Sequence, residues 1–306
     1  MAPAWPRGGY LLAELPALII TCAITGEHQK SENPTLPVTL EEQVGATAAA
    51  MAAGAAIIHI HGRNPADPTK PARMPGHYRT IADAIRARCP DAIIDFTQAT
   101  SPLEGVTDLA GALHHYTDIT LEAGPDIMSL NVGPMTFRGG GGRPSSVMAT
   151  TFDDTARVAE RLREAGIKPQ VFLYNPGHID VLEFLIERDL LESPVWVQLV
   201  FGQQSGIAPG AENVLSMVRQ LPPGTMYQVC ALESRSIEVA LLAVALGGHA
   251  RTGMEDALVY RPGEPVSGND QLVSRIVRIA KDVGRRVASP AEAREMLGLP
   301  THEEVT

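Results

Sequence analysis

Apolar and polar positions along this chain follow one repeating pattern: a short apolar run rich in β-branched residues, then a turn, then a segment with helical spacing. The apolar runs number eight, at residues 17–25, 56–63, 92–97, 126–133, 169–175, 195–202, 226–232 and 249–256. Good helix formers fill the segments between them, for example at 40–53 and 237–246. Strands that alternate with helices in this way pair in parallel.

Eight strand–helix units match a closed (β/α)8 barrel, the α/β fold called the TIM barrel. The main alternative is a doubly wound open sheet, which usually carries a glycine-rich dinucleotide turn after its first strand. The sequence TGEH at 25–28 is not such a turn. We therefore predict one barrel domain over 17–306, preceded by an N-terminal arm at 1–16. A helix-start signal at Ser289 predicts a C-terminal helical extension over 289–297.

Composition limits the class of protein. The chain has 306 residues, a length that one large α/β barrel can fill. Its formal net charge of −10 argues against nucleic acid or an anionic membrane surface as a partner. Glu14 and Pro16 interrupt the apolar stretch at 10–24, so it predicts neither a signal peptide nor a membrane span. Three widely spaced cysteines form no disulfide framework, and we expect a cytoplasmic protein.

Polar residues end nearly every predicted strand. Barrel enzymes place their chemistry where the strands end and the following loops begin. The polar strand ends include Glu27, His59, His61, Asp95, Thr97, Ser129, Asn131, Glu233, Arg235, Arg251, Glu255 and Asp256. This distribution is typical of an active site.

His59 and His61 are the strongest local signal. Residues i and i+2 of a strand face the same way, roughly 6.5–7 Å apart, so both imidazoles can bind one divalent metal ion. A catalytic zinc usually has three protein ligands, and Glu255 can supply the third from the last strand, which closes the barrel beside the first. The alternatives are two hydrogen-bonded core histidines and a solvated loop acid.

Other charged residues each allow two interpretations. Arg251 and Asp256 are either a base with its cationic partner beside a metal or a structural ion pair. Glu27 is either a site carboxylate or a helix-capping acid. The run at 138–143, four glycines between two arginines, is either an anion-binding lid or a flexible linker.

Five segments of the chain resemble the β-keto acid cleavage enzymes, whose named member is the 3-keto-5-aminohexanoate cleavage enzyme of lysine fermentation. The segments are TCAITGEHQKSENPTLPVT, AGAAIIHIHGRNP, MSLNVG, GGHARTGMEDAL and VASPAEAREMLGL. They occur in the order found in the family, and the resemblance covers residues 18–299.

The resemblance implies an acyltransferase built as a (β/α)8 barrel, usually a homotetramer, with Zn²⁺ or another divalent metal and with acetyl-CoA as co-substrate. The implied reaction is a condensation followed by a retro-Claisen cleavage. A β-keto acid and acetyl-CoA would give acetoacetate and a new acyl-CoA. Carried over by motif, the metal ligands would be His59, His61 and Glu255.

The same resemblance implies roles for further residues. Asp256 would remove a proton from C2 of the keto acid, with Arg251 as its partner. Glu27 and Thr97 would complete the catalytic group. The substrate-binding residues would be Ser129, Asn131 and Gly133. An enolate formed in this way needs a base of suitable pKa and a fixed cation, which fits an acid beside an arginine.

The fifth strand departs from the family pattern PExExxxxGH, because it is PQVFLYNPGH at 169–178. Gln170 and Phe172 replace two acids that would face the pocket. In the aminohexanoate enzyme an acid from this strand meets the substrate ammonium group. We therefore expect a neutral or apolar β-keto acid here rather than a cationic one. The resemblance assigns no CoA contacts, for which Arg63, Arg235 and the run at 138–143 are candidates.

Two other functions remain open. The same histidines and glutamate suit a metal-dependent barrel aldolase or hydrolase that works without CoA. A catalytically silent barrel that acts as a binding protein is the third possibility.

Overall fold

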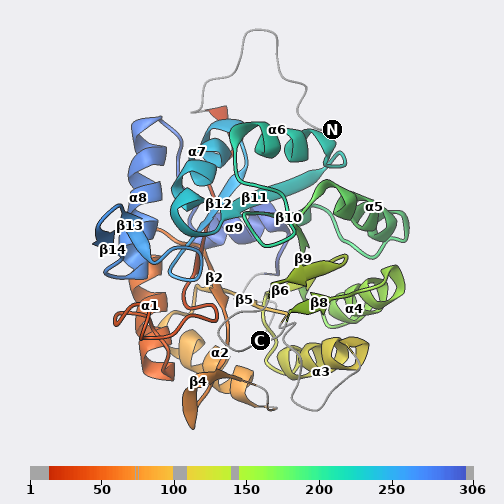
Figure 1. Cartoon of the computed structure of the whole chain (residues 1–306), viewed down its shortest axis with the longest axis horizontal. Helices are drawn as coiled ribbons and strands as arrows, with labels where there is room; N and C mark the ends of the chain where they lie inside the picture. The colour runs from red at the N-terminus through yellow and green to blue at the C-terminus, as the bar shows by residue number, and fades with distance from the viewer. Residues whose placement is uncertain (1–13, 73, 75, 99–108, 139–144, 301–306) are drawn as a thin grey trace.

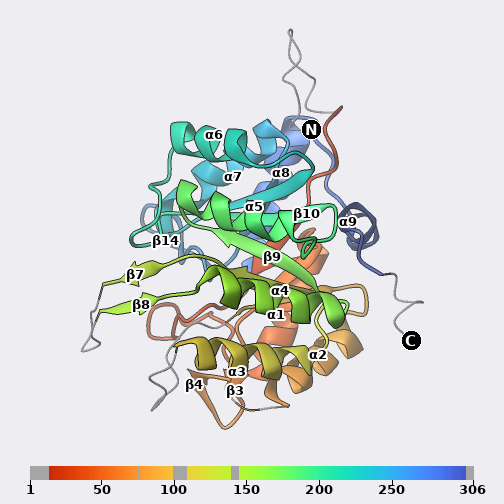
Figure 2. The same ribbon diagram turned by 90° about the vertical axis from the view of Figure 1, so that its right-hand side faces the viewer.

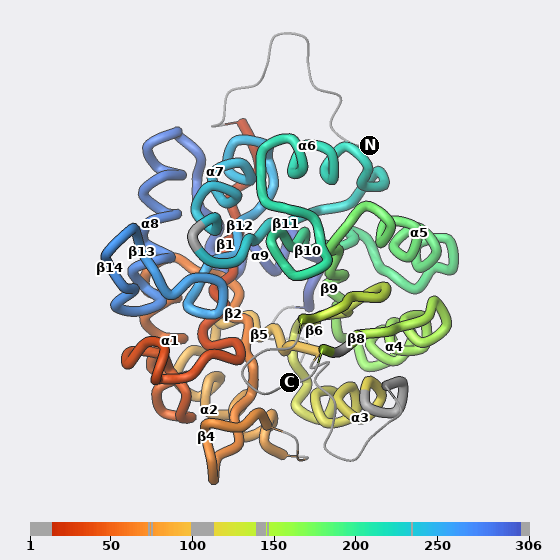
Figure 3. The backbone as a smooth tube through the Cα atoms, in the orientation of Figure 1, coloured from red at the N-terminus to blue at the C-terminus, as the bar shows by residue number. Residues whose placement is uncertain are grey.

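Eight parallel strands close into a barrel in the computed structural model, which describes residues 14–72, 74, 76–98, 109–138 and 145–300. The strands are β1 (Ile20–Ala23), β2 (Ile57–Ile60), β5 (Ile93–Phe96), β6 (Ile127–Asn131), β9 (Lys168–Leu173), β10 (Val195–Phe201), β11 (Thr225–Ala231) and β12 (His249–Thr252). Around the ring their order is β1-β12-β11-β10-β9-β6-β5-β2, so the first and last barrel strands are neighbours (Figure 3). The predicted (β/α)8 barrel is confirmed, and the doubly wound alternative is wrong.

Helices surround the barrel (Figure 1). They are α1 (Leu40–Ala53), α2 (His77–Arg88), α3 (Leu109–Leu121), α4 (Phe152–Glu164), α5 (Ile179–Glu187), α6 (Ala211–Gln220), α7 (Ser236–Leu246), α8 (Asn269–Asp282) and α9 (Pro290–Leu297). Local sequence sets their limits, as α1 illustrates. Thr39 and Glu42 form a capping box at its start, and Gly54, with φ of 115°, ends it.

Alternate residues of each strand face the helices and the barrel interior. On β9, Val171 and Leu173 pack with the surrounding helices, whereas Phe172 packs with residues of neighbouring strands. The predicted C-terminal helix α9 covers one end of the barrel, where Leu297 shares a buried apolar cluster with Ile57 on β2 and Trp196 on β10. Figure 2 shows α9 at this end and the β7–β8 hairpin (Met135–Phe137, Ser146–Met148) at the other. The barrel is therefore closed at the α9 end. A site can form at the opposite end, which is called here the mouth.

Two strands end three or more residues before the ends of the apolar runs that predict them. β2 ends at Ile60 and β12 at Thr252, so His61 and Glu255 lie in the loops that follow. At Gly253 the backbone comes so close to β1 that an added Cβ would lie 2.1 Å from the Ala23 carbonyl oxygen. This close approach, possible only for glycine, accompanies the departure from the strand.

Antiparallel hairpins extend three of the strand ends and are not predicted from the pattern. Besides β7–β8 they are β3–β4 (Arg63–Asn64, Asp67–Pro71) and β13–β14 (Val259–Arg261, Glu264–Pro265). Most of the predicted N-terminal arm and the glycines at 139–142 lie outside the described residues, so the domain boundary at residue 16 stays a prediction. Within the described part of the chain, no helix has the length and apolar character needed to cross a bilayer.

Candidate active site

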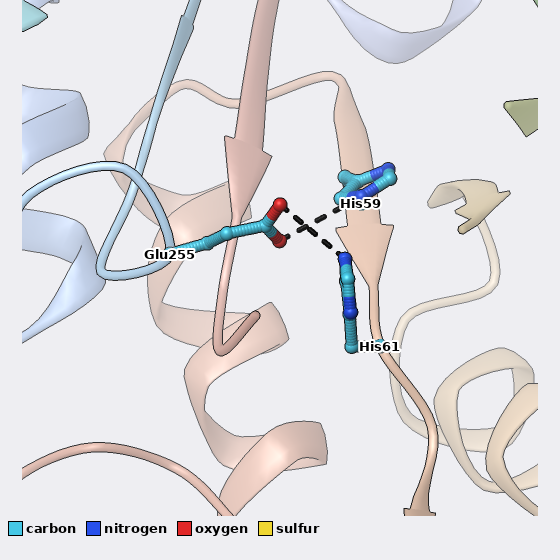
Figure 4. Close-up of side chains that lie close together, drawn as sticks. All are labelled: His59, His61 and Glu255. Carbon is cyan, nitrogen blue, oxygen red and sulfur yellow. Dashed lines mark ion pairs between the residues drawn. The ribbon is translucent and has the colours of Figure 1, made fainter. Parts of the chain in front are cut away.

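The barrel closure brings distant polar residues together at the mouth opposite α9. β12 pairs with β1 and β1 pairs with β2, so the loop after β12 faces the end of β2 across a single strand. Glu255 extends from that loop toward His59 and His61 (Figure 4). Nearly 200 residues of sequence separate the carboxylate from the imidazoles, and the fold alone makes them neighbours.

Three potential metal-ligand atoms lie close together, one each from His59, His61 and Glu255. The Nε2 atom of His59 lies 3.6 Å from Oε2 of Glu255, and the Nε2 atom of His61 lies 3.3 Å from Oε1. One ligand atom from each residue lies within 4.8 Å of the others. His59 is buried, and the other two are largely shielded from solvent. Two imidazoles and one carboxylate form a donor set that suits a divalent transition metal.

Asp95 on β5 orients His59. Its Oδ2 atom accepts a hydrogen bond of 2.7 Å from Nδ1 of His59, and both side chains are only 1% exposed. The two residues are register partners in the β2–β5 pairing. This bond places the proton on Nδ1 and leaves Nε2 with a free lone pair that faces Glu255.

Arg251 joins the carboxylates of Glu255 and Asp256. Its Nε atom donates to Asp256 Oδ2 at 3.1 Å and its Nη2 atom to Asp256 Oδ1 at 2.9 Å, and Nη2 also contacts Glu255. Its Nη1 atom is buried without a hydrogen-bond partner among the described residues. The guanidinium therefore retains one donor group for a further anion or carbonyl oxygen.

Burial and charge act together on the ionisable groups of this cluster. Burial would raise the pKa of Glu255, but Arg251 and His61 hold it well below its usual range. Burial alone would lower the pKa of His61, yet the Glu255 carboxylate raises it above its ordinary value. The pKa of Asp256 is raised, because its burial outweighs the attraction of Arg251. One carboxylate is thus a firm anion and the other a stronger base.

The β1–α1 connection supports Glu255 in two ways. Gly26, at φ +58°, lies so close that a Cβ there would be 2.5 Å from Cγ of Glu255. The Nε2 atom of His28 lies 3.2 Å from the Glu255 carbonyl oxygen. Arg63 holds this connection in place, since its Nη2 atom donates to the carbonyl oxygens of Gly26 and His28.

The remaining candidate residues lie at neighbouring strand ends. Ser129 on β6 is buried, and Thr97 is buried directly after β5. The Asn131 amide is fixed on two sides, because its Nδ2 atom donates to the Gln98 carbonyl oxygen at 3.0 Å and its Oδ1 atom accepts from the Tyr174 hydroxyl. Gly133, at φ +71°, packs against the ring of His178.

Three other charged candidates lie after β1, β2 and β11. Glu27 is exposed in the β1–α1 connection, although its charge contributes to raising the pKa of His61. Arg63 is buried, and its Nη2 atom donates to the two loop carbonyl oxygens described above. Arg235 is exposed and pairs with Glu238 at 2.6 Å.

Four residues of this region carry contacts that the sequence pattern does not predict. They are His28, Asp95, Gln98 and Tyr174. Asp95 stands among the polar strand ends, but its link to His59 appears only once the register of β2 and β5 is known. Tyr174 lies within the apolar run at 169–175, and nothing in its spacing indicates a partner on β6.

Known proteins resemble this chain along most of its length. The family model of the beta-keto acid cleavage enzymes matches residues 17–299. The 3-keto-5-aminohexanoate cleavage enzyme of Acetoanaerobium sticklandii is 32% identical over 283 residues, covering 92% of this chain and 98% of that enzyme. The 3,5-dioxohexanoate:acetyl-CoA acetone transferase of Paraburkholderia graminis is 31% identical over 308 residues, covering 92% of this chain and 96% of that enzyme.

A solved structure shares the fold. The apo structure of ObcA superposes with a TM-score of 0.70 at 20% sequence identity, over 88% of this chain and 66% of ObcA. At this identity the likeness concerns the barrel alone.

Proposed function

Because the chain belongs to the beta-keto acid cleavage enzyme family, we propose that the cluster around Glu255 and Arg251 is where a β-keto acid reacts with acetyl-CoA. The enzyme is an acyltransferase: a β-keto acid and acetyl-CoA give acetoacetate and the acyl-CoA of the remaining substituent. The observation that carries the site assignment is the Glu255 carboxylate between two imidazoles, beside a buried arginine and a second carboxylate.

His59, His61 and Glu255 would hold a divalent metal ion, for which we propose zinc. Their fit rests on the donor set and on the buried Oε2 atom of Glu255, which has no hydrogen-bond partner among the described residues. When bound, the metal supplies a Lewis acid for the oxygens of the keto acid, which favours formation of an enolate. Asp95 keeps His59 in the tautomer that such a site requires.

Asp256 removes the proton from C2 of the β-keto acid. Its raised pKa makes it a better base than an ordinary aspartate, and its bonds to Arg251 orient the carboxylate. The Nη1 group of Arg251 is placed to donate to a carboxylate or keto oxygen of the substrate. The C2 carbanion then attacks the thioester carbonyl of acetyl-CoA and releases the CoA thiolate. The thiolate attacks the original keto carbon of the substrate, the bond between that carbon and C2 breaks to give the new acyl-CoA, and C2 of acetoacetate takes back the proton from Asp256.

Other residues of the mouth complete the proposal. Ser129, Asn131 and Gly133 would bind the substrate, and Thr97 and Glu27 would line the catalytic group. Tyr174 and Gln98 fix the Asn131 amide, so that one Nδ2 hydrogen remains for an acceptor. Such fixed donors lower the cost of reorganisation when charge develops.

We further propose a cytoplasmic homotetramer. Acetyl-CoA, a reactant, is a cytoplasmic metabolite, and the three cysteines are free and buried. Sedimentation analysis and cell fractionation test these two points.

The experiment that tests the function is incubation of the zinc-loaded protein with acetyl-CoA and a set of β-keto acids. We expect acetoacetate and one new acyl-CoA to form together, and neither to form when acetyl-CoA is left out. Cleavage of a keto acid without acetyl-CoA would instead indicate the aldolase or hydrolase alternative.

A further inference from the structure

Charged groups of the site come from one half of the barrel ring. The residues of the metal-ligand and arginine cluster are His59, His61, Asp95, Arg251, Glu255 and Asp256, which lie on or directly after β2, β5 and β12. These strands and β1 form one continuous half of the ring. The structure describes every residue of β9, β10 and β11 in the other half, and their single charged residue is Lys168 at the start of β9. The site therefore has a charged side and an uncharged side.

Four residues of the uncharged side pack together and are called here the apolar wall. They are Phe172 on β9, Tyr174 directly after β9, Val200 on β10 and Cys230 on β11. Phe172, Val200 and Cys230 are each no more than 6% exposed, and Tyr174 is partly buried. Adjacent positions such as Val171 and Leu199 pack toward the helices instead, so the wall faces the barrel interior.

The apolar wall directly adjoins the charged cluster. The Phe172 ring lies 6.2 Å from the ring of His59, centroid to centroid, and the Arg251 Cζ atom lies 5.9 Å from the Phe172 centroid. The Tyr174 ring is 6.4 Å from that of Phe172. A substrate held by the charged cluster through its carboxylate and keto oxygens would place its remaining substituent close to this wall.

We propose that the apolar wall receives the substituent on the keto carbon, and that the enzyme therefore selects β-keto acids whose substituent is uncharged and apolar. This inference rests on the proposed function of the site. A charged substituent would lose its hydration against Phe172, Val200 and Cys230, none of which offers it an ionic partner. The guanidinium of Arg251, beside the ring of Phe172, also repels a second cation.

Neighbouring residues do not supply the missing charge. Gln170, Gln198 and Gln228 are buried on the same three strands and are neutral amides. Glu233 and Arg235, which follow β11, are exposed, and Arg235 already pairs with Glu238. An apolar surface discriminates only modestly between substrates that differ by one methylene. It discriminates strongly against a substrate whose charge it leaves unpaired.

Three six-carbon β-keto acids of equal length test this assignment: 3-oxohexanoate, 3-oxoadipate and 3-keto-5-aminohexanoate. Their substituents on the keto carbon are propyl, 2-carboxyethyl and 2-aminopropyl, which are apolar, anionic and cationic, respectively. We expect kcat/KM with acetyl-CoA to be higher for 3-oxohexanoate by about 100-fold. Titration calorimetry of each keto acid with the zinc-loaded protein, without acetyl-CoA, should give the same order of affinities.

Substitutions in the wall sharpen the test. Phe172→Glu should lower kcat/KM for 3-oxohexanoate by about 100-fold and move the preference toward the cationic substrate. Phe172→Leu, which keeps the surface apolar, should leave the order of preference unchanged. Because Phe172 lies near His59, a second variant, Val200→Glu, places the same charge on the wall from β10.

The outcomes are distinct. A preference for the anionic or cationic substrate, with acetoacetate formed, would overturn the wall assignment and leave the proposed function intact. If no keto acid yields an acyl-CoA, the proposed function fails. The calorimetric order then decides the wall assignment, because tighter binding of a charged substrate would refute it and tighter binding of 3-oxohexanoate would support it.

Discussion

Replacing Gly26 by alanine should displace Glu255 and weaken metal binding. A Cβ atom at this position would lie 2.5 Å from Cγ of Glu255, whereas an ordinary contact begins near 3.4 Å. Relief of this clash would move the Glu255 side chain by about 0.9 Å, whereas metal–ligand distances tolerate only about 0.2 Å. A misplacement of this size can cost about 100-fold, so we expect zinc affinity to fall by at least about tenfold and activity by more.

Gly124→Ala is the matched control for this substitution. Gly124 has φ of +56°, almost the same as the +58° of Gly26, but a Cβ there would meet nothing within 4 Å. Both variants share the backbone cost of about 1–2 kcal/mol for alanine in the left-handed region. Zinc affinity, measured by competition with a fluorescent chelator, should change only in Gly26→Ala. Equal zinc affinities in the two variants would refute the reasoning.

Two further predictions concern the buried side chains of Asp95 and His249. Asp95→Asn should weaken zinc binding by about 10–100-fold, because the amide can donate to Nδ1 of His59 and favour the wrong tautomer. The control is Asp91→Asn, at the exposed start of the same segment, which should leave zinc binding unchanged. An unchanged zinc affinity in Asp95→Asn would contradict this. Burial and Arg285 lower the pKa of His249 from 6.5 to about 3, so the unfolded chain binds the extra proton and stability falls as the pH falls from 6.5 toward 3. Urea denaturation of metal-free protein should show about 2 kcal/mol of this loss by pH 5, and His249→Gln should remove it, so identical pH profiles for both proteins would argue against it.

The barrel can be predicted from the sequence because each unit carries its own signals. Apolar runs such as that at 195–202 become buried strands, and the segment of good helix formers at 40–53 becomes a helix over the same residues. The short hairpins carry no comparable signal. β3 and β14 span two residues each, too few for any periodic pattern.

The residues of the site can be predicted only in part from such local signals. Strand ends point to His59 and Glu255, because closure of the barrel makes the first and last strands neighbours. The partner of His59 depends on the register of β2 and β5, which spacing does not reveal. Within the β1–α1 connection the sequence singles out Glu27, whereas the structure places the ring of His28 against the Glu255 carbonyl oxygen. A shift of one residue in a loop decides such contacts.

The apolar wall illustrates a further limit. The replacement of an acid by Phe172 is visible in the fifth strand, but Val200 and Cys230 join it from two other strands. Only the side-by-side order of β9, β10 and β11 turns three unrelated apolar residues into one surface.

The fate of an isotopic label tests the central claim most directly. The zinc-loaded protein is incubated with 3-oxohexanoate and acetyl-CoA carrying ¹³C at the thioester carbonyl, and the products are followed by NMR. In the proposed reaction the acetyl group becomes the methyl ketone of acetoacetate, so the label should appear at C3 of acetoacetate, with one butanoyl-CoA formed for each acetoacetate. Unlabelled acetoacetate, or loss of the keto acid without butanoyl-CoA, would contradict the account.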